Sequence, residues 1–245
     1  MHVVIVPTPA EAGAAAAHQA AQALREALAA QGTARLILAT GASQFEMLSC
    51  LTRAAGIEWA WVTCFHLDEY IGIPPEHPAS FRKYLQERFT RHVTAGGFHF
   101  IWGDAPDAAA ECRRLGALLS EAPIDLALVG IGENGHLAFN DPPADFTTRQ
   151  PYIIVELDEA CRRQQVDEGW FPNLQAVPGR AISMSIHQIM ACRQVICTAP
   201  DLRKARAVQN SLEGPVTPDC PASILQQHPR CSLFLDEASA SLLKR

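Results

Sequence analysis

Short apolar runs alternate with helix-forming stretches along almost the whole chain, and this alternation constrains the fold more than any other feature. The runs are bounded by glycine, proline or polar residues, which is typical of buried strands. The stretches between them are alanine-rich or amphipathic, as surface helices are. Repeated β-α units predict a mostly parallel sheet covered by helices on both faces. We therefore expect a Rossmann-like α/β fold.

The alternation also places the elements. The predicted strands are residues 2–7, 36–39, 61–67, 125–131, 152–157, 181–185, 194–198 and 232–235. The predicted helices are residues 10–31, 44–55, 79–90, 106–120, 201–212 and 222–228. A polar segment near 158–178 is expected to form a helical lid. Because no repeat, low-complexity tract or linker interrupts the pattern, we expect one domain over residues 1–245.

Charge and hydropathy exclude several classes of protein. The formal net charge is −6, which argues against a nucleic-acid partner. No apolar run approaches the roughly 20 residues that span a bilayer, so we expect no membrane association. The eight cysteines form no CxxC pair and are expected to be reduced, without a metal. Since the first residues carry no basic region typical of a signal peptide, a cytoplasmic location is expected.

The most informative motif is Val129–Pro142, a glycine-rich loop directly behind the apolar run 125–131. In open α/β sheets, ligands bind at the carboxyl ends of such strands. The loop contains His136, whose imidazole can both take and give a proton near neutral pH. Asp141 could hold that imidazole in one orientation. Taken alone, a loop histidine is more often a structural residue than a catalytic one, and Gly132 and Gly135 could equally serve a tight turn.

Two further loops follow predicted strands. The residues Thr40, Gly41, Ala42 and Ser43 form a small-residue turn before a helix, which suits the backbone for binding an anion. Asp68 and Glu69 place two carboxylates at the end of a buried strand, and Asp68 could abstract a proton from carbon while Glu69 points elsewhere. The alternatives are ordinary turn chemistry for the first loop and a capping role for Asp68.

Together these motifs resemble the glucosamine-6-phosphate deaminase (isomerase) family. The resemblance covers most of the chain and is carried by a small set of segments. They are Leu38–Ser43, Phe65–Tyr70 with Glu76–Pro78, Gly130–Pro142, Lys204–Val208 with Glu213–Gly214, and Pro221–Leu225 with His228–Pro229. The resemblance implies conversion of glucosamine 6-phosphate and water to fructose 6-phosphate and ammonium, without a cofactor.

The resemblance also implies roles for individual residues. Thr40 to Ser43 would bind the substrate phosphate together with Lys204, and Asp68 would move a proton between C2 and C1 of the opened sugar. His136 would open the pyranose ring, while Asn134 and Asp141 stand where the family has groups that support the histidine. The partner would be an amino-sugar phosphate, and the protein a monomer or a homo-oligomer.

The chain departs from the family at three places. The best-known members have aspartate in place of Asn134 and glutamate in place of Asp141. Asn134 cannot titrate, so it could only orient His136 through hydrogen bonds. The family also places a phosphate-binding arginine just before an aromatic pair, whereas Trp170–Phe171 follow Glu168 and Gly169. Either Arg162 or Arg163 reaches in from upstream, or the phosphate contact is weakened.

Three alternatives to glucosamine-6-phosphate deamination remain from sequence alone. A galactosamine-6-phosphate deaminase differs in one hydroxyl of its substrate. A 6-phosphogluconolactonase shares the glycine loop, but this chain continues with Ala138–Pro142 and carries the Asp68–Tyr70 element. From another class, a non-catalytic sugar-phosphate-binding module would need neither Asp68 nor His136.

Overall fold

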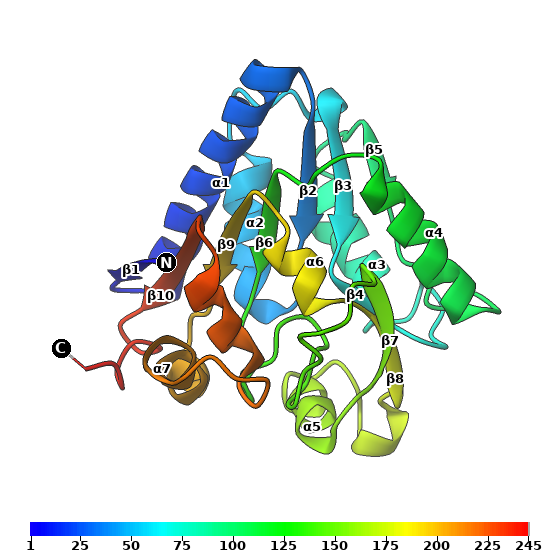
Figure 1. Cartoon of the computed structure of the whole chain (residues 1–245), viewed down its shortest axis with the longest axis vertical. Helices are drawn as coiled ribbons and strands as arrows, with labels where there is room; N and C mark the ends of the chain where they lie inside the picture. The colour runs from blue at the N-terminus through cyan, green and yellow to red at the C-terminus, as the bar shows by residue number, and fades with distance from the viewer. Residues whose placement is uncertain (245) are drawn as a thin grey trace.

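The computed structural model describes residues 1–244, and its centre is a seven-stranded sheet of order β1-β10-β9-β6-β2-β3-β5 (Figure 1). Every neighbouring pair in this sheet is parallel, as the sequence predicts. The strands are β1 (His2–Val6), β2 (Ala34–Leu38), β3 (Val62–His66), β5 (Gly97–His99), β6 (Leu126–Val129), β9 (Gln194–Thr198) and β10 (Cys231–Asp236).

A second, antiparallel sheet of order β4-β8-β7 is absent from the sequence prediction. It contains β4 (Asp68–Tyr70), β7 (Tyr152–Glu156) and β8 (Arg180–Met184). Leu67 joins the two sheets, because its N–H donates to Leu38 of β2 and its carbonyl accepts from Met184 of β8. Asp68 therefore begins a strand of the small sheet, and does not extend β3 as the sequence suggested.

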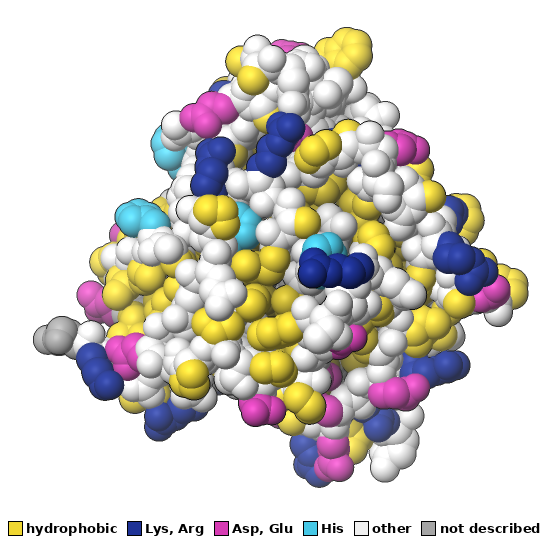
Figure 2. Space-filling view, viewed as in Figure 1, with side chains coloured by type: hydrophobic (Ala, Val, Ile, Leu, Met, Phe, Trp, Pro, Cys, Tyr) yellow, Lys and Arg dark blue, Asp and Glu magenta, His cyan; other side chains and the backbone are white. Residues whose placement is uncertain are grey.

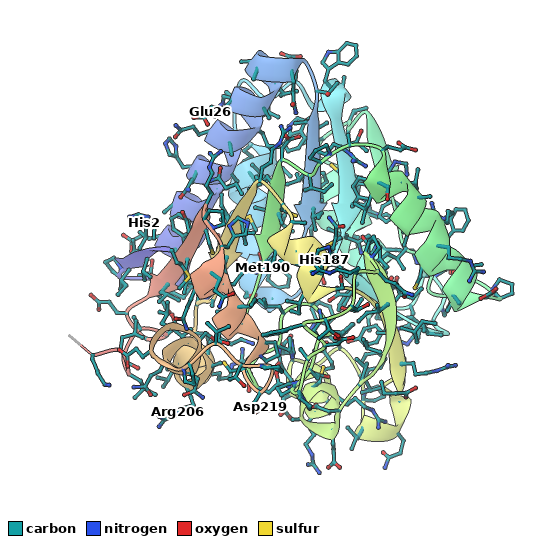
Figure 3. The ribbon with its side chains drawn as sticks, viewed as in Figure 1. His2, Glu26, His187, Met190, Arg206 and Asp219 are labelled. Atoms are coloured by element: carbon teal, nitrogen blue, oxygen red, sulfur yellow. The ribbon has the colours of Figure 1, made fainter. Side chains whose placement is uncertain are left out.

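Helices cover both faces of the large sheet. The α-helices are α1 (Pro9–Gln31), α2 (Phe45–Thr52), α3 (Phe81–Leu85), α4 (Ala108–Ser120), α5 (Glu159–Asp167), α6 (Ile186–Met190) and α7 (Ala205–Glu213). On β2, Leu36 and Leu38 pack with α1 and α2, while Ile37 packs with α4 and α6. Alternate side chains of β2 therefore enter the cores on opposite faces of the sheet, as in a strand that is buried on both faces. Figure 3 labels His187 and Met190 on α6, on the side of the sheet that faces the viewer.

Several elements differ from their predicted form. The predicted helix 79–90 is split into α3 and a π-helical turn, Gln86–Thr90. Residues Pro221–Gln227 form a 3₁₀ helix, and the short α6 and β5 escape prediction. In the expected lid the α-helix ends at Asp167, because Gly169 adopts a φ of 81° and Pro172 follows, and a 3₁₀ turn, Leu174–Ala176, lies beyond them.

None of the helices described within residues 1–244 combines the length and apolar character of a membrane span. On the face shown in Figure 2, basic side chains lie apart from one another and form no continuous patch. Figure 1 shows α5 and α7 at the lower end of the molecule, towards which the arrows of β2 and β3 point. The carboxyl ends of the central strands therefore face these two helices.

Candidate active site

Four neighbouring strands of the large sheet, in the order β9-β6-β2-β3, carry the loops that line one cavity of about 210 Å³. Chain connections run outward in opposite directions from the adjacent pair β2 and β6, so a crevice opens between their following loops. The cavity is lined by Thr40 to Ser43 after β2, Asp68 after β3, His136 after β6 and Lys204 after β9. Three loops that the sequence singled out thus meet at one place.

The turn after β2 is shaped for an anion. Gly41 has a φ of 97°, a conformation that favours glycine, and a 3₁₀ turn over Ala42–Gln44 leads into α2. The first N–H groups of such a turn have no partner within it, and Ala42 and Ser43, which carry them, line the cavity. The fully buried Gln44 donates to Ser43 Oγ at 3.0 Å and accepts from the hydroxyl of Thr198 at 3.0 Å. Gln44 therefore links Ser43 to Thr198 of β9.

Asp68 is a buried carboxylate at the edge of the cavity. Its exposed fraction is 6%, yet it lines the open space. Burial raises its pKa well above the usual range, and the charge of the adjacent Glu69 adds to the effect. Among residues 1–244, no group donates a hydrogen bond that would fix the Asp68 carboxylate oxygens. A carboxylate in this state is a strong base for a ligand's proton.

Glu69, by contrast, points away from the cavity and has a structural role. Its carboxylate accepts from Ser80 Oγ at 2.8 Å and from the backbone N–H groups of Tyr70, Phe81 and Arg82. Burial raises its pKa, and these four hydrogen bonds oppose the rise. The two adjacent carboxylates therefore differ in position: Glu69 holds the start of α3, and Asp68 lines the cavity. The sequence predicted that Glu69 points elsewhere, but not that it binds α3.

His136 has an acidic group behind it. Its Nδ1 lies 3.1 Å from Asp141 Oδ1, in an alignment that falls short of a linear hydrogen bond. Asn134 Nδ2 donates to the same Oδ1 at 3.0 Å, and its own oxygen accepts from the His136 backbone N–H at 3.1 Å. Burial alone would raise the pKa of Asp141, but His136 and Asn134 outweigh it and the pKa is lowered. Asp141 is therefore ionised and favours a proton on Nδ1.

Glycine is required beside this ring. A Cβ built on Gly132 would lie 2.3 Å from Cε1 and Nε2 of His136, so the imidazole packs directly against that glycine. The loop is further anchored by the buried Asn140, whose amide donates to the carbonyls of Leu137 at 2.7 Å and Met184 at 2.8 Å. With Nδ1 turned to Asp141, Nε2 is the nitrogen left for a ligand in the cavity.

Among residues 1–244, the lysine and arginine side chains that line the cavity are Lys204 and Arg203, both on the 3₁₀ turn Leu202–Lys204 after β9. Burial lowers the pKa of Lys204, and the charges of Glu168 and Glu133 partly offset this. Arg203 was not singled out from sequence. Its guanidinium lies 3.2 Å from Asp201 Oδ2 and 3.5 Å from Glu133 Oε1. Both cations are thus near acidic groups, and both remain open to a ligand.

The lid contributes no arginine to the cavity. Arg162 donates to the carbonyls of Leu174 at 2.7 Å and Val177 at 3.2 Å, and Arg163 pairs with Glu159 on the surface. Neither side chain lines the cavity, so the expectation that one of them reaches in finds no support in the fold. The lid residues that do line it are Gln164, Gln165 and Glu168.

These lid residues are fixed by contacts to the loops below. Gln165 accepts from the Tyr70 hydroxyl at 2.8 Å, and Gln164 accepts from the Glu133 N–H at 3.2 Å. Sequence reasoning missed them because an amphipathic polar helix gives no signal for which face it turns inward. Asn134 and Asp141, which the sequence named, stand behind His136 and outside the lining.

The sequence profile of the family described as glucosamine-6-phosphate isomerases/6-phosphogluconolactonase matches residues 7–233. A glucosamine-6-phosphate deaminase of Lactobacillus delbrueckii subsp. bulgaricus is 35% identical over 246 residues, which is 100% of both chains. A glucosamine-6-phosphate deaminase of Arthrobacter sp. is 37% identical over 250 residues. The match covers 100% of this chain and 93% of the Arthrobacter protein.

Two solved structures of enzymes with related names are also similar to this chain. A monomeric glucosamine-6-phosphate deaminase superposes with a TM-score of 0.91 at 32% identity, over 99% of this chain and 100% of that one. A 6-phosphogluconolactonase from Shewanella baltica superposes with a TM-score of 0.80 at 20% identity, over 96% of this chain and 97% of that one. The second likeness shows a shared fold.

Proposed function

This chain belongs to the glucosamine-6-phosphate isomerase/6-phosphogluconolactonase family, and we propose that it converts glucosamine 6-phosphate and water to fructose 6-phosphate and ammonium. The observation that carries the proposal is the meeting of a buried carboxylate, a histidine and an anion-binding turn in one cavity. Full-length relatives that carry the name of this deaminase support the choice of reaction.

The first step is opening of the sugar ring. The anomeric hydroxyl must lose a proton and the ring oxygen must gain one, and a single imidazole can do both. Asp141 favours the proton on Nδ1 of His136, which leaves Nε2 with a free electron pair towards the cavity. Asn134 keeps Asp141 in place through the hydrogen bond to Oδ1.

The second step moves a proton from C2 to C1. In the open aldehyde the C2 hydrogen is acidified by the neighbouring carbonyl, so a carboxylate without metal can remove it. Asp68 takes this proton and returns it to C1, while one proton of the C2 ammonium ends on O1; C1 then carries a hydroxyl group and C2 a protonated imine. Water then hydrolyses the imine to the ketone and ammonium. The low exposure of Asp68 keeps the carboxylate poorly solvated and therefore basic.

The phosphate lies at the far end of the substrate, between the turn Thr40–Ser43 and Lys204. Arg203 supplies a second cation beside Lys204, in place of an arginine from the lid. We propose that the protein is a monomer, because the chain is similar over 99% of its length to a monomeric glucosamine-6-phosphate deaminase. A cytoplasmic location fits the eight free cysteines and a phosphorylated substrate.

Release of ammonium tests the proposal directly. Purified protein is incubated with glucosamine 6-phosphate, galactosamine 6-phosphate and 6-phosphogluconolactone in parallel, and ammonium, fructose 6-phosphate and acid production are measured. We expect ammonium and fructose 6-phosphate in equal amounts from the first substrate. A faster reaction with galactosamine 6-phosphate would show that the galacto epimer is the preferred substrate. Hydrolysis of the lactone without deamination would overturn the proposed reaction.

A further inference from the structure

On the side of His136 away from the cavity, three possible metal ligands converge. A ring nitrogen of His136, a carboxylate oxygen of Asp141 and the thiol of Cys161 all lie within 4.8 Å of one another, and Nδ1 is the nitrogen that lies 3.1 Å from Asp141 Oδ1. Cys161 stands in the first turn of α5, whose N-cap Asp158 accepts from the Cys161 N–H. Among residues 1–244 no other group of three such side chains comes as close together.

We propose that His136, Asp141 and Cys161 form a binding site for Zn²⁺ and that the bound ion inhibits the enzyme. An imidazole, a carboxylate and a thiol are the ligand types that zinc takes in proteins, commonly as three side chains plus water. A thiol also disfavours Mg²⁺ and Ca²⁺, which prefer oxygen ligands. This inference rests on the proposed role of His136 only for its inhibitory consequence.

The geometry needs little adjustment. A tetrahedral zinc ion with bonds of about 2.0–2.3 Å holds its ligand atoms roughly 3.3–3.7 Å apart. The His136 and Asp141 atoms are 3.1 Å apart, and the sulfur lies within 4.8 Å of both, so shifts of about 1 Å suffice. The Nδ1 atom is buried and has no well-aligned hydrogen bond, so it is available as a ligand.

The surroundings supply the support that metal ligands usually have. Asn134 donates to Asp141 Oδ1 at 3.0 Å, and the Asp158 N–H donates to Oδ2 at 3.2 Å. Burial raises the pKa of the Cys161 thiol, and the charge of Asp141 raises it further, so the free protein keeps the thiol protonated. A dication reverses this balance, because it stabilises the thiolate and neutralises the carboxylate.

Binding would stop ring opening. When zinc binds, the Cys161 proton leaves to solvent and the ring proton of His136 moves from Nδ1 to Nε2. Nε2 then has no free electron pair for the anomeric proton. The phosphate turn and Lys204 are untouched, so substrate still binds. Zinc should therefore lower kcat and leave KM nearly unchanged.

Two measurements on the full-length protein test the site, with Cys161→Ser as the variant and Cys192→Ser as the control. Cys192 is another buried cysteine, and its sulfur contacts the Gln188 carbonyl, away from the cavity. The first measurement titrates Co²⁺ and follows the thiolate-to-cobalt charge-transfer band, which needs no catalytic activity. In the wild type and in the Cys192→Ser control, we expect the band to saturate at one equivalent of Co²⁺. In Cys161→Ser and Cys161→Ala we expect no band.

The second measurement titrates Zn²⁺ during deamination. Cys161 touches no substrate, so its serine variant should keep the activity of the wild type without metal. Its inhibition by Zn²⁺ should be weaker by at least about tenfold, and a chelator should restore wild-type activity. The proposal is overturned if the wild type shows no cobalt band, or if Cys161→Ser keeps the band or the full inhibition. A cobalt band in a protein without deaminase activity would leave the site standing and the proposed function refuted.

Discussion

Asn134 donates a hydrogen bond to the oxygen of Asp141 that lies nearest the His136 ring. The asparagine therefore orients the carboxylate, and the carboxylate orients the imidazole. This arrangement explains how the chain can dispense with a titrating group at position 134. It also compensates for the short aspartate at 141, because the loop brings the ring to 3.1 Å without a bridging group.

We predict that Asp141→Asn lowers kcat by about 10²–10⁴-fold, the usual contribution of a positioned acid–base group. The amide cannot stabilise a protonated ring and can turn its N–H₂ towards Nδ1, which selects the wrong tautomer. KM should change little, since Asp141 does not line the cavity. Steady-state kinetics beside Asp145→Asn, an exposed aspartate that accepts from Thr147, provide the test. Equal kcat in both variants would remove Asp141 from the mechanism.

The acid limb of the pH–rate profile should lie well above the pKa of an exposed aspartate, about 3.9. Asp68 must be ionised to act as a base, and burial, with the charge of Glu69, raises its pKa. Turnover therefore rises as the pH rises through that elevated pKa. The profile of kcat/KM against pH, with structure monitored by circular dichroism, measures the limb. An acid limb near pH 4 in a folded enzyme would contradict this assignment.

Asp68→Asn should abolish turnover and raise the melting temperature at neutral pH. The folded-state pKa of Asp68 is raised, so the folded protein loses stability as the pH rises from the unfolded value to that pKa. Asparagine avoids this loss and fills nearly the same volume. Each kcal/mol gained would raise Tm by about 2–4 °C in a chain of this size. The gain should vanish at a pH below about 3.9, where both proteins are uncharged at this position. Deamination by the variant at a near-normal rate would exclude Asp68 as the base.

Much of this arrangement could be predicted from the sequence, because glycines and polar residues directly follow apolar runs that had to be strands. Asp68 and His136 were found in this way, whereas Lys204 was named only through the family resemblance; that all three meet follows from the strand order. Strand β4 could not be predicted, since its three residues, Asp68–Tyr70, carry no periodicity of their own. Arg203 and Cys161 were missed for another reason: their importance depends on which way a short helix turns its side chains.

Lys204→Ala and Arg203→Ala should each raise KM by about 10- to 100-fold, which corresponds to the loss of one charge-assisted hydrogen bond to the phosphate. Turnover should fall less, because neither cation reaches the reacting carbons. Arg163→Ala is the matched control, since that guanidinium pairs with Glu159 at the surface. If KM for Arg203→Ala equals that of the control, Lys204 and the turn after β2 hold the phosphate without Arg203.

Gly132→Ala should lower kcat by about 10²-fold, although the new methyl group has no chemistry of its own. The added Cβ would lie 2.3 Å from Cε1 and Nε2 of His136, so the ring must move away. A displacement of about 1 Å in a catalytic group can cost that factor. Binding should be preserved, because Thr40–Ser43 and Lys204 lie on other loops. The measurement is kcat and KM beside Gly179→Ala, where a Cβ meets no atom within 4 Å. Gly132 lines the cavity but carries no reactive group, so a loss confined to kcat, with KM unchanged, assigns the effect to the displaced ring of His136 and not to a blocked binding site. An unchanged kcat would contradict the assignment of His136 as the group that opens the sugar.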